Sequence, residues 1–229
     1  MISVWAPTVD EVLNSLKNRD WPAWIDTETK SRIQRLHRCQ DRRRSLAGHV
    51  LARTMIAAQI GIPVEEIRVN YDRFGKPELL SRNVFYNLAH CGVRVACALG
   101  SVRLGIDLEQ IRNLHSFEEI CKKVLTPREQ RAIELAEDRL ERFFEFWTLK
   151  ESYVKATGRG LSHPLASFEL ERTAVGWSVR DRSSDYNWSL STYRLRDGYW
   201  IAVCADTPSL GGELCPFEIC LTTSFPFQE

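Results

Sequence analysis

The sequence predicts an α+β fold built from two similar lobes. Each half of the chain has one long helical stretch, followed by a break that contains Gly or Pro and then by several short runs typical of strands. We expect residues 1–104 to form the N-terminal lobe and residues 105–229 the C-terminal lobe, joined near residues 100–112. A site between two such lobes can take ligand contacts from both.

The helix expected at 41–60 is the main element of the first half. Apolar residues recur in it near helical spacing, and Gly61 and then Pro63 end it. A short surface helix is expected at 9–18, and the Gly-Lys-Pro sequence at 75–77 indicates a turn between two strands. Four strands are expected in this half, at 67–71, 84–88, 93–99 and 104–108.

The helix expected at 138–157 organises the second half, and Gly158 and Gly160 end it. Before it, the Thr-Pro-Arg-Glu sequence at 126–129 has the pattern of a capped helix start, with Glu129 as the capping-box residue. Further strands are expected at 168–172, 177–180, 188–195, 199–205 and 217–222.

Composition restricts the class of protein. The chain has 229 residues, 44% of them hydrophobic, so it can bury a sizeable core. Its net charge of +1 argues against binding nucleic acid over the whole surface, and no run approaches the roughly 18–20 apolar residues of a membrane span. Seven cysteines without a CxxC pair, and a start without a signal-peptide pattern, lead us to expect a cytoplasmic protein.

Three acids in two short segments point to a divalent metal. Asp107 and Glu109 lie two residues apart and would face the same way on a strand. Glu151 belongs to an aromatic helix that is too apolar to be a solvated face. Magnesium prefers carboxylate oxygens together with water and substrate phosphate oxygens. The alternative for the Asp107–Glu109 pair alone is an edge strand with solvated acids.

Basic side chains near these acids suggest an anionic ligand. Lys150 and Lys155 flank Glu151 on the aromatic helix, where phosphate is a natural partner for an ammonium group. The alternative is an ordinary surface pair of Glu151 and Lys155, four residues apart. His90, just before a Gly, is either a ligand contact or a structural histidine. Residues 30–53 hold eight basic residues against one acid and would attract anions: Lys30, Arg32, Arg35, Arg38, Arg42, Arg43, Arg44 and Arg53.

Two motifs at a fixed spacing resemble the 4′-phosphopantetheinyl transferases of the Sfp-like, surfactin-synthetase-activating class. GIDLE at 105–109 resembles the G-[IV]-D-x-E element of that class, and FWTLKESYVKATGRGL at 146–161 resembles its [FW]-x-x-K-E-[SA]-x-x-K element. The resemblance covers about residues 27–165 and implies a pseudo-dimer of two α/β lobes, each a long helix packed on a small, mostly antiparallel sheet. Further matching segments are RRRSLAGHVLAR (42–53), RFGKPEL (73–79) and FYNLAHCG (85–92).

The resemblance implies an enzyme, a magnesium-dependent holo-carrier-protein synthase. Such an enzyme transfers the 4′-phosphopantetheine arm of coenzyme A, its co-substrate, to a serine hydroxyl of an apo acyl or peptidyl carrier protein and releases adenosine 3′,5′-bisphosphate. Family analogy implies a monomer, and the carrier is left open. The alternative is a non-catalytic coenzyme A- or nucleotide-binding module on the same fold. A weaker alternative is an RNA-binding protein that uses the basic segment at 30–53, but no strand has the interleaved aromatic pattern of RNA-binding modules.

The resemblance also implies roles for single residues. Asp107, Glu109 and Glu151 are the expected metal ligands, and Lys155 is expected to meet the transferred phosphate or to stabilise the leaving group. Glu151, acting directly or through metal-bound water, is the first candidate base, and Glu129 the second. The expected coenzyme A contacts are Arg44 and Lys150 at phosphates, His90 at the 3′-phosphate, Lys76 beside the adenine, and Lys30 and Arg32 as further basic contacts.

One position departs from the class. Many members have Ser before the histidine, whereas this chain has Ala89 before His90. Because Ala89 cannot donate a hydroxyl to the 3′-phosphate, we expect weaker selection of coenzyme A over 3′-dephospho-coenzyme A.

Overall fold

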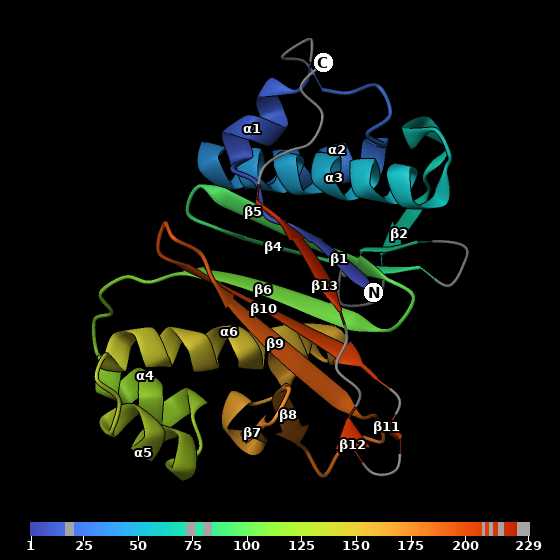
Figure 1. Cartoon of the computed structure of the whole chain (residues 1–229). Helices are drawn as coiled ribbons and strands as arrows, with labels where there is room; N and C mark the ends of the chain where they lie inside the picture. The colour runs from blue at the N-terminus through green and yellow to red at the C-terminus, as the bar shows by residue number, and fades with distance from the viewer. Residues whose placement is uncertain are drawn as a thin grey trace.

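The computed structural model describes residues 1–16, 21–71, 77–79, 84–207, 209–210, 213–214 and 218–223. Figure 1 shows four layers, in which helices cover the outer face of each of two sheets that pack against one another. Three buried apolar clusters fill the spaces between successive layers. The expected α+β fold of two lobes, each with a long helix on a small sheet, is therefore confirmed.

The sheet of the N-terminal lobe has the strand order β13-β1-β5-β4. Its strands are β1 (Ile2–Trp5), β4 (Phe85–Cys91), β5 (Arg94–Gly100) and β13 (Ile219–Thr222). Strand β5 pairs antiparallel with both β1 and β4, whereas β13 pairs parallel with β1, as the red strand beside the blue one in Figure 1. A strand near the end of the chain thus completes the N-terminal sheet, and the lobe boundary expected at residue 104 stays a prediction.

Helix α3 (Cys39–Ile60) packs on this sheet and ends at Gly61, which takes the left-handed conformation with φ 67°. It confirms the helix predicted at 41–60. Around it lie α1 (Val9–Asn14), α2 (Thr27–Gln34), the short helix η1 (Val64–Glu66) and the small hairpin of β2 (Val69–Tyr71) with β3 (Pro77–Leu79). Residues 75 and 76 of the predicted turn lie outside the described residues.

The sheet of the C-terminal lobe has the order β6-β10-β9-β8-β7 and is antiparallel throughout. Its strands are β6 (Leu104–Gln110), β7 (Glu169–Thr173), β8 (Gly176–Arg180), β9 (Trp188–Arg194) and β10 (Tyr199–Asp206). The helices of this lobe are α4 (Phe117–Val124), α5 (Pro127–Glu134), α6 (Arg139–Thr157) and the short η2 (Gly160–Ser162) and η3 (Leu165–Ser167). A two-residue pair, β11 (Ser209–Leu210) and β12 (Glu213–Leu214), follows β10.

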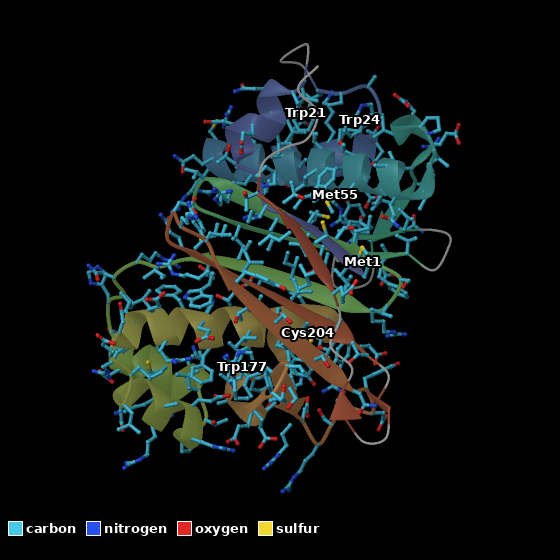
Figure 2. All side chains as sticks on the ribbon, in the orientation of Figure 1. Met1, Trp21, Trp24, Met55, Trp177 and Cys204 are labelled. Carbon is cyan, nitrogen blue, oxygen red and sulfur yellow. The ribbon has the colours of Figure 1, made fainter. Side chains whose placement is uncertain are left out.

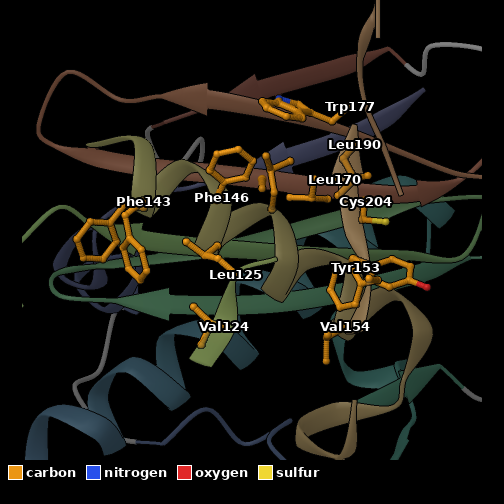
Figure 3. Packing of buried hydrophobic residues seen from close by; sticks show 14 of the residues in the cluster. Val124, Leu125, Phe143, Phe146, Tyr153, Val154, Leu170, Trp177, Leu190 and Cys204 are labelled. Carbon is orange, nitrogen blue, oxygen red and sulfur yellow. The ribbon is translucent and has the colours of Figure 1, made fainter. Parts of the chain in front are cut away.

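Aromatic side chains fill the core beneath α6. Phe146 on α6 meets the Trp177 ring edge to face at 5.5 Å, and Tyr153 meets Phe168 at 4.6 Å. Figure 3 shows these α6 side chains packed against the strands of the C-terminal sheet, and Figure 2 shows Trp177 and Cys204 in that lobe, far from Trp21 and Trp24. The apolar flanks of the predicted helix therefore serve mainly the core. Within the described part of the chain, no helix is both long and apolar enough to cross a membrane.

The two lobes meet along edge strands β4 and β6 and around the turn after β4. Arg94 donates to Asp197 at 2.6 Å across the junction, and the Val93 backbone N–H donates to the Tyr199 hydroxyl at 3.2 Å. Gly92 has φ 55°, and a Cβ there would lie 2.3 Å from the Tyr199 hydroxyl oxygen. Glycine at 92 therefore lets the turn of one lobe press against the other lobe.

Candidate active site

The site lies where β6 runs against α6, and Gly105 makes this close approach feasible. A Cβ at Gly105 would lie 2.2 Å from the carbonyl oxygen of Ser152 and 2.3 Å from the backbone nitrogen of Ala156. Alternate side chains on β6 face the core between the sheets: Leu104, Ile106 and Leu108. Because side chains alternate along a strand, Asp107 and Glu109 face the opposite way, toward α6.

Asp107 forms an ion pair with the helix. Its Oδ1 lies 2.6 Å from Nζ of Lys155, and the residue is only 5% exposed. Its other oxygen, Oδ2, is buried and has no hydrogen-bond partner among the described residues. Burial raises the pKa of Asp107, the Lys155 ammonium acts against that rise, and the Glu109 carboxylate adds to it. The unsatisfied oxygen marks a place where a cation or a donor would fit.

Glu151 stands one turn before Lys155 on α6, so both side chains lie on the face of the helix that meets β6. The pKa of Glu151 is raised to about 6, first by partial burial and then by the neighbouring Asp107 carboxylate, with Lys155 opposing the rise and Glu109 adding to it. The three carboxylates therefore act on one another. Glu151 titrates close to neutral pH, in the range that suits a general base.

Glu109 is held by two donors. Arg112 Nη1 lies 2.9 Å from its Oε2, and the Cys91 thiol donates to the same oxygen with a sulfur–oxygen distance of 3.3 Å. Burial and then the charge of Glu109 raise the pKa of the Cys91 thiol to about 11, so the thiol keeps its proton at neutral pH. Sequence reasoning did not single out Cys91 or Arg112, since neither stands at a recognisable motif spacing from Glu109.

The three carboxylates form a donor set that fits a hard divalent cation such as magnesium. In the described part of the chain, no three acidic, His or Cys side chains converge on one point as around a bound ion. Instead Asp107 holds Lys155 and Glu109 holds Arg112. The unpartnered Asp107 oxygen and the two carboxylates that act on it are the groups that would hold such an ion, and in this structure Lys155 and Arg112 are the partners of Asp107 and Glu109.

Basic groups from three elements lie near the junction of the lobes. Arg44 on α3 donates from Nε to the Gly92 carbonyl at 2.7 Å and from Nη1 to Asp41 at 2.8 Å. His90 is an exposed residue of β4, and partial desolvation, then Lys155, then Arg44 lower its pKa. Arg44, His90 and Lys155 therefore share one electrostatic region between the lobes, which favours a phosphate group.

Ala89, the residue before His90, is buried. It is 4% exposed and packs in the apolar cluster between the two sheets, where the class has a serine. The loss of a hydroxyl contact to a 3′-phosphate stays a prediction.

The structure places Lys150 in the core of the C-terminal lobe, and its expected contact with coenzyme A stays a prediction. Its ammonium is 0% exposed, lies 2.9 Å from Oε2 of Glu129, and donates to the carbonyls of Leu165 and Phe168, both at 2.8 Å. Burial lowers the pKa of Lys150, and the Glu129 carboxylate works against that shift. Lys150 therefore ties the segment after α6 to α5.

Glu129, the second candidate base, is engaged by groups of its own lobe. Its Oε2 accepts from the Thr126 backbone at 2.8 Å, which confirms the predicted capping box, and its Oε1 accepts from the Leu170 backbone at 2.9 Å. Both carboxylate oxygens are engaged and the residue is 2% exposed, an arrangement typical of a structural residue, and its role as a base stays a prediction.

The remaining predicted coenzyme A contacts lie elsewhere or are not described. Lys30 on α2 sits over the Trp21 ring, with Nζ 5.5 Å from its centroid. Arg32 pairs with Glu28 at 3.2 Å and stacks on Tyr71 at 4.0 Å. These partners belong to the outer part of the N-terminal lobe, so the roles of Lys30 and Arg32 stay predictions. Lys76 lies outside the described residues.

Comparisons with known proteins match both lobes. A family model described as the N-terminal part of 4′-phosphopantetheinyl transferase matches residues 3–101, and one described as the 4′-phosphopantetheinyl transferase superfamily matches residues 103–204. The chain is 31% identical to the 4′-phosphopantetheinyl transferase Sfp of Bacillus subtilis (strain 168), over 90% of this chain and 93% of that protein. It is 29% identical to the 4′-phosphopantetheinyl transferase HetI of Nostoc sp., over 81% and 84% of the two chains.

A solved holo-(acyl-carrier-protein) synthase from Bacillus anthracis, in complex with coenzyme A (3′,5′-ADP), is also similar. It aligns with a TM-score of 0.41 and 19% identity, covering 46% of this chain and 95% of the synthase. The paired family models and the 31% identity across nine-tenths of the chain extend the resemblance seen in the two motifs to both lobes. The chain therefore belongs to the 4′-phosphopantetheinyl transferase superfamily of enzymes.

Proposed function

We propose that this transferase moves the 4′-phosphopantetheine arm of coenzyme A to a serine hydroxyl of an apo carrier protein. The reaction needs magnesium and releases adenosine 3′,5′-bisphosphate. One observation supports the proposal: three carboxylates and three basic side chains, the cations Arg44 and Lys155 with the imidazole of His90, come from four elements at the junction of the two lobes. A metal-bound diphosphate needs both kinds of group side by side.

Asp107, Glu109 and Glu151 would hold the metal ion, which when bound offsets the negative charge of the diphosphate. Glu151 is the group that we assign to accept the proton of the carrier serine, because its carboxylate lies in the site beside Asp107. The serine oxygen forms a bond to the β-phosphorus, and the bond from that phosphorus to the bridging oxygen breaks. The bridging oxygen leaves with adenosine 3′,5′-bisphosphate.

The cationic groups bind and orient the nucleotide. His90 and Arg44 lie on the N-terminal lobe and suit the 3′-phosphate, since the Arg44 charge acts on the His90 ring and a neutral imidazole can still donate a hydrogen bond to a phosphate oxygen. Lys155 is held 2.6 Å from Asp107 and is 30% exposed at its side chain, so its ammonium can turn toward a phosphate oxygen. There it stabilises the charge that builds on the leaving group.

We also propose that the enzyme works as a monomer in the cytoplasm. Among the described residues, Cys97 and Cys121 are buried free thiols. Free thiols in a core are typical of a reducing compartment.

Mass spectrometry of a carrier protein tests the proposal. Purified enzyme is incubated with coenzyme A, magnesium chloride and a panel of apo acyl and peptidyl carrier proteins. We expect one carrier serine to gain the mass of one phosphopantetheine group, and chelation of magnesium by EDTA to stop the gain. A carrier whose serine is replaced by alanine is the control. Coenzyme A binding without any mass gain across the panel would favour a non-catalytic binding module instead.

A further inference from the structure

Two side chains of β4 form hydrogen bonds to the backbone of β6 across the junction of the lobes. Strands β4 and β6 are edge strands of different sheets and lie next to each other. Asn87 accepts a hydrogen bond from the Ile106 backbone N–H at 2.9 Å, and the Cys91 sulfur accepts one from the Gln110 backbone N–H at 3.4 Å. The partner residues advance together along both strands, so β4 and β6 run in the same direction and are bridged at two matched points.

The two bridges differ in what lies beside them. Asn87 bonds to the backbone at Ile106, whose side chain belongs to the apolar core between the sheets. Cys91 bonds to the backbone at Gln110 and also donates its thiol hydrogen to Oε2 of Glu109 at 3.3 Å. Cys91 therefore contacts a carboxylate of the candidate metal site from the opposite lobe, while Asn87 does not.

We propose that Cys91 is a positioning residue that holds the Glu109 carboxylate in the metal site. The inference rests on the proposed function, because it takes Glu109 as a metal ligand. Arg112 binds the same Glu109 oxygen, and its side chain is 51% exposed. Without the thiol, the carboxylate is free to follow Arg112 toward solvent. With the thiol, Glu109 stays at the lobe boundary, beside Asp107 and Glu151.

The size of the effect follows from what is known of metal-site partners. Groups that hydrogen-bond a metal ligand fix its orientation, and their removal typically weakens metal binding by about 10- to 100-fold. We therefore expect Cys91→Ala to weaken binding of manganese, used as a spectroscopic probe for magnesium, within that range. Cys91→Ser keeps both a donor and an acceptor and should restore affinity to within about threefold of wild type, since a hydroxyl replaces the thiol.

Manganese binding to the enzyme without coenzyme A or carrier, followed by electron paramagnetic resonance, measures this directly. The matched control is Asn87→Ala, which removes the other bridge between β4 and β6. It should lower the melting temperature and leave manganese affinity unchanged. In steady-state assays, Cys91→Ala should raise the magnesium concentration needed for half-maximal rate more than it lowers kcat at saturating magnesium.

A double variant separates positioning from a general effect on the lobe junction. If Cys91 acts through Glu109, Cys91→Ala should weaken manganese binding no further once Glu109→Ala is present. Equal losses of manganese affinity in Cys91→Ala and Asn87→Ala would overturn the inference while leaving the proposed function intact. The same holds if Cys91→Ser fails to restore manganese affinity. Unchanged manganese affinity in Glu109→Ala would instead remove the metal assignment of the proposed function, and the role of Cys91 with it.

Discussion

Nζ of Lys155 lies 2.6 Å from Oδ1 of Asp107, and this ion pair joins helix α6 to strand β6 in the middle of the site. The pair brings together one residue from each of the two sequence motifs. In this structure the lysine holds the carboxylate that we assign to the metal. A metal that binds Asp107 would compete with the Lys155 ammonium for the carboxylate and would leave the ammonium available to a phosphate. Metal binding at the first motif would thus change the partner of Lys155 in the second.

Replacing Asp107 by asparagine should abolish most of the activity. The amide keeps the shape but lacks the charge for a metal and for Lys155, so we expect kcat/KM to fall by at least about 100-fold. The carrier-modification assay measures the fall. Asp197→Asn is the matched control, because Asp197 also pairs with a cation between the lobes, Arg94 at 2.6 Å. Asp197→Asn should keep most of the activity, and similar losses in both variants would contradict the special role of Asp107.

Binding of manganese should depend on pH through Glu151. Its pKa is raised to about 6, so the metal must compete with a proton as the pH falls through that value. We expect affinity to rise between about pH 5 and pH 7 in wild type and to be weaker and flatter over this range in Glu151→Gln. Titrations at several pH values measure this. An unchanged midpoint in Glu151→Gln would assign the titration to another group.

Manganese affinity should rise with pH, whereas the contribution of Glu151 to the free energy of unfolding should fall as the pH rises. The folded pKa of about 6 lies above the ordinary value of 4.5, so the folded chain holds the Glu151 proton more tightly than the unfolded chain does. This contribution to stability is present below pH 4.5 and is lost as the pH rises through 6. Glu151→Gln should therefore gain about 1 kcal/mol relative to wild type between pH 4.5 and pH 7.5. Urea unfolding at both pH values measures the gain, and Glu66→Gln, at an exposed site, should show none.

The two lysines of the second motif should behave differently. Lys150 is fully buried against Glu129, whereas Lys155 is partly exposed in the site. Removal of one partner of a buried pair typically costs about 3–5 kcal/mol, so Lys150→Ala should destabilise the fold by that order. Lys155→Ala should lose kcat and keep most of its stability. Urea unfolding measures the stability of both variants, and initial rates measure their activity. A Lys150→Ala variant of normal stability without activity would instead assign Lys150 to the active site.

The different surroundings of Lys150 and Lys155 follow from their positions around helix α6. Lys150 and Lys155 are five residues apart, which places them about 140° apart around a helix, so they cannot serve the same face. Glu151 and Lys155, four apart, do share a face, as expected. The second motif correctly predicted helix α6. Helical geometry then explains why Lys155 pairs with Asp107 while Lys150 pairs with Glu129 on another side of the helix.

Elements with a clear local signal were predictable from sequence, and those that depend on distant partners were not. Helices α3 and α6 and the capping box at Thr126 follow from periodicity and capping. Helices α2 and α4 were not predicted. Polar α2 has little periodic signal, whereas α4 carries apolar residues at helical spacing, at 117, 120, 121 and 124, that sequence reasoning overlooked. The pairing of β13 with β1 joins residues over 200 positions apart, which no local pattern records. The contact of Cys91 with Glu109 depends on the same kind of long-range placement.

Gly105→Ala should disrupt the fold. The new Cβ would lie 2.2 Å from a backbone oxygen of α6, and neither backbone can move without separating helix and strand. We expect a loss of about 3 kcal/mol or more, or failure to fold. Gly48→Ala, inside α3, is the control, because its nearest atoms are side-chain carbons at 3.8 Å. That variant should gain about 0.5–1 kcal/mol from helix propensity. Thermal unfolding compares them, and a soluble Gly105→Ala of normal stability would contradict the close approach of β6 and α6.

His90→Ala should change which nucleotide the enzyme prefers. His90 shares its electrostatic region with Arg44 and Lys155, and we assign it to the 3′-phosphate. The variant should raise KM for coenzyme A by about tenfold, the effect of losing one charge-assisted hydrogen bond. It should leave KM for 3′-dephospho-coenzyme A unchanged, because that substrate lacks the phosphate. Steady-state assays with both substrates give the ratio, and an equal rise for the two would place His90 at another part of the nucleotide. Lys155→Ala is the comparison, since a residue that acts on the breaking bond should lower kcat for both substrates alike.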